Sequence, residues 1–183
     1  MKTSTLNKIR SCDPCADGWA KLLKYLGKTA ADDEPLSFIT ILESNGLDDA
    51  LWCCRSAPEY NREWRLYAVW CARQVQHLML DPRSIAAIDV AERYSNGVAT
   101  DAELAAARIA ARATEWAEVG AAHAALTAVL AAAWKEGASG AASEVARAVR
   151  AAERAAEWSA RATGETRAAQ IIKFREIISG ETI

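Results

Sequence analysis

Alanine is the feature that most constrains this chain, because 30 of its 41 alanines fall between Ala99 and Ala169. Alanine is the best helix former and a poor strand former, so this tract is predicted to be helical. Seven tryptophans and only two phenylalanines accompany the alanines. Since one indole buries as much area as several methyl groups, we expect closely packed, alanine-lined helices held together by tryptophan side chains.

Composition and charge are those of a globular protein. The chain has 183 residues, 51% hydrophobic and 25% charged, which is enough for one domain with a hydrophobic core. A formal net charge of −2 gives no general attraction to DNA or to an anionic membrane. The longest uncharged stretch, Gly120 to Trp134, is too short and too rich in alanine to span a bilayer. Because no apolar signal-peptide core follows Met1, we expect a cytoplasmic protein without membrane contact.

Turn and cap residues divide the first half of the chain into short helices. Asp17 is expected to cap the first of them, and the acidic run Asp32–Glu34 before Pro35 is expected to begin the second. The expected helices run from Gly18 to Gly27, from Asp32 to Gly46, from Leu47 to Ser56, from Tyr60 to Leu80 and from Asp81 to Gly97.

The second half of the chain is expected to form fewer and longer helices. Thr100–Glu103 is a capping box, in which threonine and glutamate each bond a backbone N–H at the start of a helix. Further helices are expected to end at Gly137, Gly164 and Gly180, the last carrying Ile171, Ile172, Phe174, Ile177 and Ile178. No segment predicts a convincing strand. The expected fold is all-α, an irregular bundle of about eight or nine helices.

Weak internal repeats leave an alternative architecture open. The segment Ala50–Arg55 recurs as Ala68–Arg73, and Arg112–Trp116 recurs as Arg154–Trp158. The separation between Arg112 and Arg154 matches the length of two-helix repeats, which is roughly 40–47 residues. Stacked helical hairpins are therefore the alternative to an irregular bundle.

The composition of the sequence also changes near residue 98. We expect one domain with two subregions: residues 1–97, with short helices, tryptophans and all five cysteines, and residues 98–183, with long alanine-rich helices.

Cys12-Asp13-Pro14-Cys15 is the most suggestive short motif. Three interpretations are open: packing as small hydrophobic side chains, half of a zinc site, or thiol redox chemistry. A zinc site needs two more ligands, and the sequence contains no second C-x-x-C. We therefore expect packing, and we predict no metal site.

Catalytic groups are not expected elsewhere in the chain. His77 and His123 each lack a nearby partner of the kind that histidine catalysis needs. The acidic runs Asp32–Glu34 and Asp48–Asp49 have the character of helix-start charges. The prediction is a protein that is not an enzyme and that binds no cofactor.

Two helical stretches carry distinct faces. Between residues 61 and 78 the predicted core face consists of Trp64, Tyr67, Ala68, Cys71, Val75 and Leu78, with Trp70 off that face.

Between residues 141 and 162, arginines lie on one face of the predicted helix with a tryptophan beside them: Arg147, Arg150, Arg154, Arg161 and Trp158. We call these five residues the arginine stripe. It is either a solvated face, a protein-docking surface built from residues typical of interface hot spots, or a contact for a nucleic-acid backbone. Glu153 and Glu157 flank the stripe and favour a protein partner.

Two neighbouring segments of the first half resemble known proteins. Leu47–Ser56 (LDDALWCCRS) and Asn61–Val75 (NREWRLYAVWCARQV) resemble small alanine- and tryptophan-rich proteins of phages and prophages. Those proteins are similar in turn to a family of immunity proteins found beside bacterial polymorphic toxins. The resemblance covers roughly residues 1–110 and brings no catalytic residues with it, and it implies that the Trp-Cys-x-Arg elements are packing positions.

The resemblance implies a function by stoichiometric binding. We expect a non-catalytic inhibitor or immunity-type protein, encoded by a phage or prophage, that neutralises a bacterial effector in the host cytoplasm. The expected partner is a toxin or an antiphage defence complex such as a CRISPR ribonucleoprotein, bound through the arginine stripe. A nucleic-acid-binding helical protein and a self-assembling helical scaffold are the alternatives, and a homo-oligomer stays open.

Overall fold

The computed structural model of the chain describes residues 1–114, 146–147, 149–151 and 163–180. In this part of the chain eight α-helices have defined bounds, residues 146–147 and 149–151 are also helical, and there are three short 3₁₀ helices and a two-stranded sheet. The all-α prediction is therefore confirmed. The elements, in order, are β1 (Thr3–Ser4), α1 (Leu6–Ser11), α2 (Ala16–Leu26), β2 (Leu36–Ser37), α3 (Phe38–Asn45), α4 (Leu47–Cys53), η1 (Cys54–Ser56), η2 (Pro58–Tyr60), α5 (Asn61–Gln74), η3 (Gln76–Leu78), α6 (Pro82–Ser95), α7 (Asp101–Thr114) and α10 (Thr163–Ser179).

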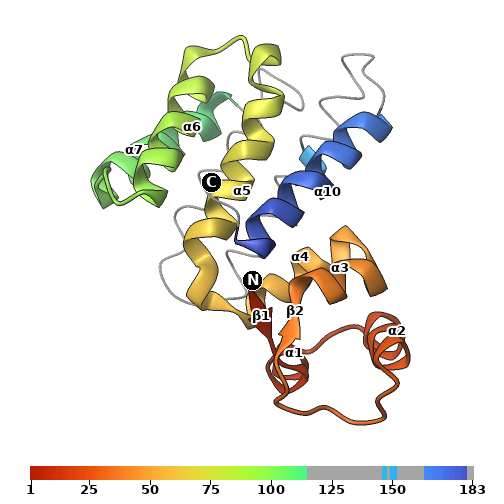
Figure 1. The fold of residues 1–183 in the computed structure, drawn as a ribbon. Helices are drawn as coiled ribbons and strands as arrows, with labels where there is room; N and C mark the ends of the chain where they lie inside the picture. The colour runs from red at the N-terminus through yellow and green to blue at the C-terminus, as the bar shows by residue number, and fades with distance from the viewer. Residues whose placement is uncertain (115–145, 148, 152–162, 181–183) are drawn as a thin grey trace.

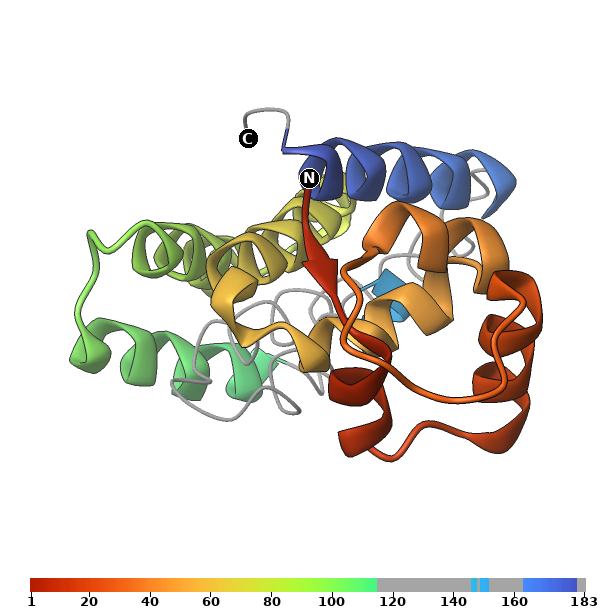
Figure 2. The same cartoon turned by 60° about the horizontal axis from the view of Figure 1, so that its bottom comes forward.

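Helix α5 occupies the middle of this arrangement. Helices α6 and α7 pack on each other at one end of the molecule, and α1 and α2 lie at the opposite end (Figures 1 and 2). Helix α10 runs beside α5 and also contacts α3, although it is far from both of them in sequence. The last described helix therefore joins a core that is formed mainly by residues 6–111, with Val149 and Ala151 also buried in it.

Trp64 on α5 is the centre of that core and has no solvent-exposed surface. Its ring lies 5.2 Å from the ring of Phe38 on α3 and 6.0 Å from that of Phe174 on α10, measured between centroids. Its indole Nε1–H donates to the carbonyl of Ala57 at 3.1 Å, which satisfies the one polar atom of the side chain. Tyr67, one turn further along α5, packs against Phe174 at 5.4 Å. Three distant segments thus meet on one indole.

The predicted core face of α5 is confirmed. Trp64, Tyr67, Ala68, Cys71 and Val75 are all at most 2% exposed. Leu78 packs against the core with part of its surface exposed, and so does Trp70, which the spacing had placed off the core face. The helix is shorter than expected, because after Gln74 the chain tightens into 3₁₀ turns, with Val75 N–H bonded to the Ala72 carbonyl.

Local cap signals locate several helix ends correctly. Thr100 and Glu103 form the predicted capping box: Glu103 N–H donates to Thr100 Oγ1 at 3.3 Å, and Thr100 N–H donates to Glu103 Oε2 at 2.8 Å. Asp81 caps α6, with its carboxylate accepting from Arg83 N–H. Gly27 ends α2 in the left-handed conformation that glycine adopts without steric cost.

The expected helix start at Asp32–Glu34 is wrong. Helix α3 begins at Phe38, capped by the hydroxyl of Ser37, which accepts from Thr40 N–H at 3.0 Å. The acidic run lies in the preceding loop, where Asp32 and Glu34 pair with Lys28 at 2.5 and 2.6 Å.

The prediction of no strand is also wrong, because two short strands form. Strands β1 and β2 pair antiparallel, with Thr3 opposite Ser37 and Ser4 opposite Leu36. This pairing places the Leu36 side chain in the core, at 7% exposed, and holds residue 36 extended where a helix was expected. The division of the chain into subregions at residue 98 stays a prediction.

Candidate functional site

Two members of the predicted arginine stripe lie in the described residues, and both are exposed. Arg147 and Arg150 are on the surface, whereas Val149 between them is fully buried, as the predicted helical faces require. Arg154, Trp158 and Arg161 lie outside the described residues. The arginine stripe as a partner-binding surface therefore stays a prediction.

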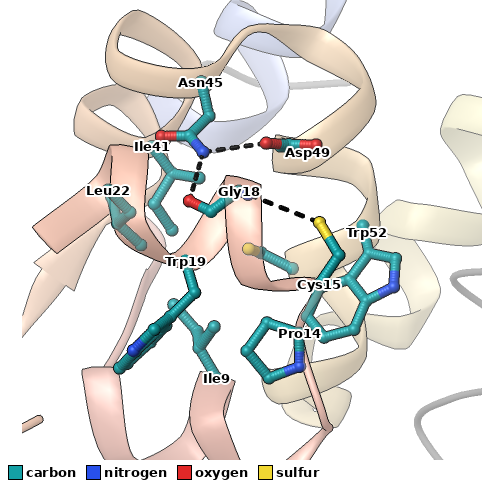
Figure 3. A pocket seen from close by; sticks show the side chains of 11 residues that line it. Ile9, Pro14, Cys15, Gly18, Trp19, Leu22, Ile41, Asn45, Asp49 and Trp52 are labelled. Atoms are coloured by element: carbon teal, nitrogen blue, oxygen red, sulfur yellow. Dashed lines mark hydrogen bonds between the residues drawn. The ribbon is translucent and has the colours of Figure 1, made fainter.

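A different surface feature is visible in detail: a small pocket between α2, α3 and α4, next to the Cys12–Cys15 turn (Figure 3). It has a volume of about 120 Å³, room for a group the size of one apolar side chain. Its wall is largely apolar and includes two cysteines and two polar side chains. The lining residues are Ile9, Pro14, Cys15, Gly18, Trp19, Leu22, Ile41, Asn45, Asp49, Trp52 and Cys53.

The polar side of the pocket is held together by Asn45. Its Nδ2 donates both to the Gly18 carbonyl at 2.9 Å and to Asp49 Oδ2 at 2.8 Å, so it ties α2 to α4 (Figure 3). Gly18 has little free space around its backbone there. A Cβ added to it would lie 3.0 Å from Asp49 Oδ2 and 3.1 Å from Cys15 Sγ. The carboxylate and the thiol therefore both press close to the same backbone position.

Cys15 is the cap of α2, and this corrects the expectation that Asp17 would be. The Sγ atom of Cys15 accepts a hydrogen bond from Gly18 N–H at 3.4 Å, whereas Asp17 lies inside the first turn. Asp17 retains the favourable charge of an acidic residue at a helix N-terminus. Cysteine at a cap position is a signal that sequence rules for helix starts do not contain.

The remaining residues of the motif form a tight turn between α1 and α2. Cys12 is half-buried, and its Sγ–H donates to the Lys8 carbonyl at 3.4 Å. Asp13 has a φ of 58°, the left-handed conformation that is uncommon for a residue with a side chain. Cys15 is exposed. Packing in a core, the interpretation favoured by the sequence, therefore does not describe this cysteine.

Two tryptophans belong to the pocket wall, and an arginine stacks on one of them. Trp19 and Trp52 line the pocket, and both keep part of their surface exposed. The guanidinium of Arg55 lies over the Trp52 ring, 4.2 Å from its centroid, and Arg55 Nε donates to the Trp52 carbonyl at 2.9 Å. Partial burial lowers the pKa of Arg55 from its ordinary value. We call Pro14, Trp19, Trp52 and Arg55 the tryptophan surface.

The sequence did not single out this surface. The Trp-Cys-x-Arg elements were expected to be packing positions, and Cys53 and Cys71 are indeed buried in the core. Trp52 differs because it lies at the edge of that core with its indole in the pocket wall (Figure 3). The available signal was the three-residue spacing of Trp52 and Arg55, which puts an aromatic ring and a cation on one helical face.

The described residues contain no cluster of potential metal ligands. In residues 1–114 and the other described ranges, no three histidine, cysteine, aspartate or glutamate side chains are grouped as a metal ion would require. His77 is exposed on η3, and His123 lies outside the described residues. The acidic pair Asp48–Asp49 lies in the first turn of α4, the position expected for helix-start charges.

Two further observations bear on what the chain is. Among the described helices, none combines the length and the apolar character that crossing a membrane requires. Comparison with protein-family models, with curated proteins and with solved structures finds no match to this chain.

Proposed function

We propose that this protein acts by binding another protein stoichiometrically, as a non-catalytic inhibitor or immunity-type protein of phage or prophage origin. Its target would be a bacterial effector, either a toxin or an antiphage defence complex such as a CRISPR ribonucleoprotein, met in the bacterial cytoplasm. The resemblance of residues 47–75 to small phage proteins suggests this class. The observation that carries the proposal is the tryptophan surface beside its open pocket.

The tryptophan surface has the composition of an interface hot spot. Tryptophan and arginine are the residues most often found to dominate binding energy, and such residues act beside pockets from which water is excluded. Here Trp19 and Trp52 are partly exposed and flank a pocket that fits one apolar side chain. The stacked Arg55 adds a cation that the indole holds in place.

The surface is also supported by buried neighbours and hydrogen bonds within the protein. Trp52 lies on α4, whose neighbours Leu51 and Cys53 are buried, and Asn45 ties that helix to α2. Preorganised side chains lose less conformational entropy on binding, so more of the contact energy appears as affinity. A partner side chain would therefore enter a pocket whose walls are already formed.

Co-purification with matched variants tests the proposal. The tagged chain is expressed in a bacterial host that carries active defence systems, and bound proteins are identified at stoichiometric yield. Arg55→Glu reverses a charge on the tryptophan surface and is expected to reduce the bound partner at least about tenfold, the effect of losing one hot-spot residue. Tyr25→Ala is the control, because Tyr25 is an exposed aromatic on α2 that does not line the pocket. Thermal unfolding must be unchanged in both variants.

The arginine stripe is tested in the same experiment by Arg154→Glu. Loss of the partner with Arg154→Glu and retention with Arg55→Glu would move the docking site to the stripe. Bound nucleic acid that is removed by nuclease, with steep loss of binding as salt rises, would favour nucleic-acid binding instead. An apparent molecular mass from light scattering that increases with protein concentration, with no partner bound, would favour the self-assembling scaffold.

A further inference from the structure

The five cysteines, all of which lie in described residues, fall into two groups. Cys53, Cys54 and Cys71 are at most 5% exposed. Burial raises the pKa of the Cys53 thiol to about 12 and that of Cys54 well above its ordinary value, so these thiols are unreactive at neutral pH. Cys12 and Cys15 differ because one is half-buried and the other exposed. Reagents in solution can therefore reach this pair and not the other three.

The turn between the two helices places the two cysteines at its two ends, three residues apart in the sequence. Cys12 ends α1 and Cys15 begins α2, with Asp13 and Pro14 between them. Asp13 is held in the left-handed region at a φ of 58°, and the Pro14 ring fixes its own φ. Both cysteines are thiols in the structure. Two accessible thiols at the two ends of a turn with little freedom are the components of a dithiol that can close into a disulfide.

We propose that Cys12 and Cys15 are a thiol-modification site that reacts with low-molecular-weight disulfides of the glutathione class and closes reversibly into a disulfide. The thiolate of Cys15 attacks one sulfur of the small disulfide, which forms a mixed disulfide and releases one small thiol. The thiolate of Cys12 then attacks the Cys15 sulfur, forms the Cys12–Cys15 bond and releases the second small thiol. The two protons lost by the cysteines are taken up by the two departing thiolates, and the small disulfide is the oxidant.

The hydrogen bonds assign the order of the two steps. Cys15 Sγ accepts from Gly18 N–H, and this bond becomes charge-assisted when the sulfur is a thiolate. Cys12 Sγ donates to the Lys8 carbonyl, a bond that deprotonation of Cys12 would remove. Cys15 is exposed at the pocket (Figure 3) whereas Cys12 is half-buried, so the Cys15 sulfur is the one that a reagent meets first. Cys15 is therefore the attacking residue and Cys12 the resolving one.

The experiment uses the full chain without any partner, so its outcome is independent of the proposed function. The protein is incubated in a buffer of glutathione and glutathione disulfide, quenched with acid and alkylated, and its peptides are mapped by mass spectrometry. Wild type is expected to yield a Cys12–Cys15 disulfide, lighter by two hydrogen atoms. Cys12→Ser is expected to accumulate one glutathione on Cys15. Cys15→Ser is expected to react at least about tenfold more slowly, because the accessible thiolate is gone.

We expect the Cys15→Ser variant to fold, because serine is itself a preferred helix cap and preserves the cap of α2. A slower reaction of this variant then reports the loss of the thiol. A peptide spanning residues 11–16 serves as the control that the buffer oxidises an accessible dithiol. Wild type that stays reduced while this peptide is oxidised would overturn the proposal. So would a disulfide between Cys15 and Cys53, or equal reaction rates in Cys12→Ser and Cys15→Ser.

Discussion

The hydrogen bond from Tyr67 to α10 gives the sharpest test of how the core is closed. The Tyr67 hydroxyl donates to the Gln170 carbonyl at 3.0 Å, across 103 residues of sequence, and both residues are at most 1% exposed. Burial raises the pKa of Tyr67 well above its ordinary value, so the hydroxyl keeps its proton under all ordinary assay conditions. Tyr67→Phe removes this donor and leaves the ring contacts with Phe174 in place.

The expected effect follows from the loss of the hydrogen bonding of the Tyr67 hydroxyl inside the core, to the Gln170 carbonyl and to Cys71. Losing such a bond lowers the free energy of unfolding by about 1–2 kcal/mol. Phenylalanine fills nearly the same volume as tyrosine, so no cavity adds to the loss. At a urea m-value of about 2 kcal/mol/M, the unfolding midpoint is expected to fall by roughly 0.5–1 M with the slope unchanged.

Tyr25→Phe is the matched control, because Tyr25 is 56% exposed on the surface of α2. Its free energy of unfolding is expected to stay within about 0.5 kcal/mol of wild type. Equal midpoints for Tyr67→Phe and Tyr25→Phe would refute the reasoning, since they would mean that α10 is not docked on α5 through this bond.

Three further predictions concern the core, a cap and the pocket. Phe174→Ala is expected to lower the free energy of unfolding by about 3–5 kcal/mol in the same urea assay, because a fully buried ring is replaced by a cavity. Hydrogen bonds from Thr100 N–H, the Arg93 guanidinium and the Thr100 hydroxyl together lower the pKa of Glu103 from 4.5 to about 2, so the stability they give is present above pH 4.5 and lost as the pH falls towards 2. Glu103→Gln should flatten that fall when urea midpoints are measured across this range. Gly18→Ala should lower the melting temperature, since its Cβ would press on Asp49, and an increase of the kind usual for glycine to alanine in a helix would contradict this.

Helix ends set by local signals could be predicted from the sequence, and those set by distant contacts could not. Thr100 and Glu103 are close neighbours in sequence, so the capping box they form needs nothing else. The start of α3 depends instead on Ser4 pairing with Leu36, a contact between two strands that are far apart in the chain. That pairing keeps Leu36 extended and leaves Ser37 as the cap, although the acidic run nearby has the better helix-start pattern.

The core of α5 was predictable for a related reason, because the spacing of Trp64 and Tyr67 places both on one helical face. The pocket was not. Trp52 belongs to a short helix with buried residues on either side of it in sequence, so spacing offered no reason to treat it as an edge residue. The surroundings of its indole depend on α2, which is held in place where the Gly18 carbonyl accepts a hydrogen bond from Asn45 of α3. That distant contact decides whether the indole lies in the core or at a pocket wall.

The late position of α10 in the chain has a consequence for how the protein is made. Phe174 is one of the rings that enclose Trp64, and Arg167 and Arg175 reach back to Asp48 and Glu43 across 119 and 132 residues. While the ribosome is still making the segment before α10, the emerging chain has Trp64 and Tyr67 without the helix that covers them. Such an intermediate presents an uncovered apolar surface to the cell. Chaperones are therefore expected to hold the nascent chain until α10 has emerged and can dock.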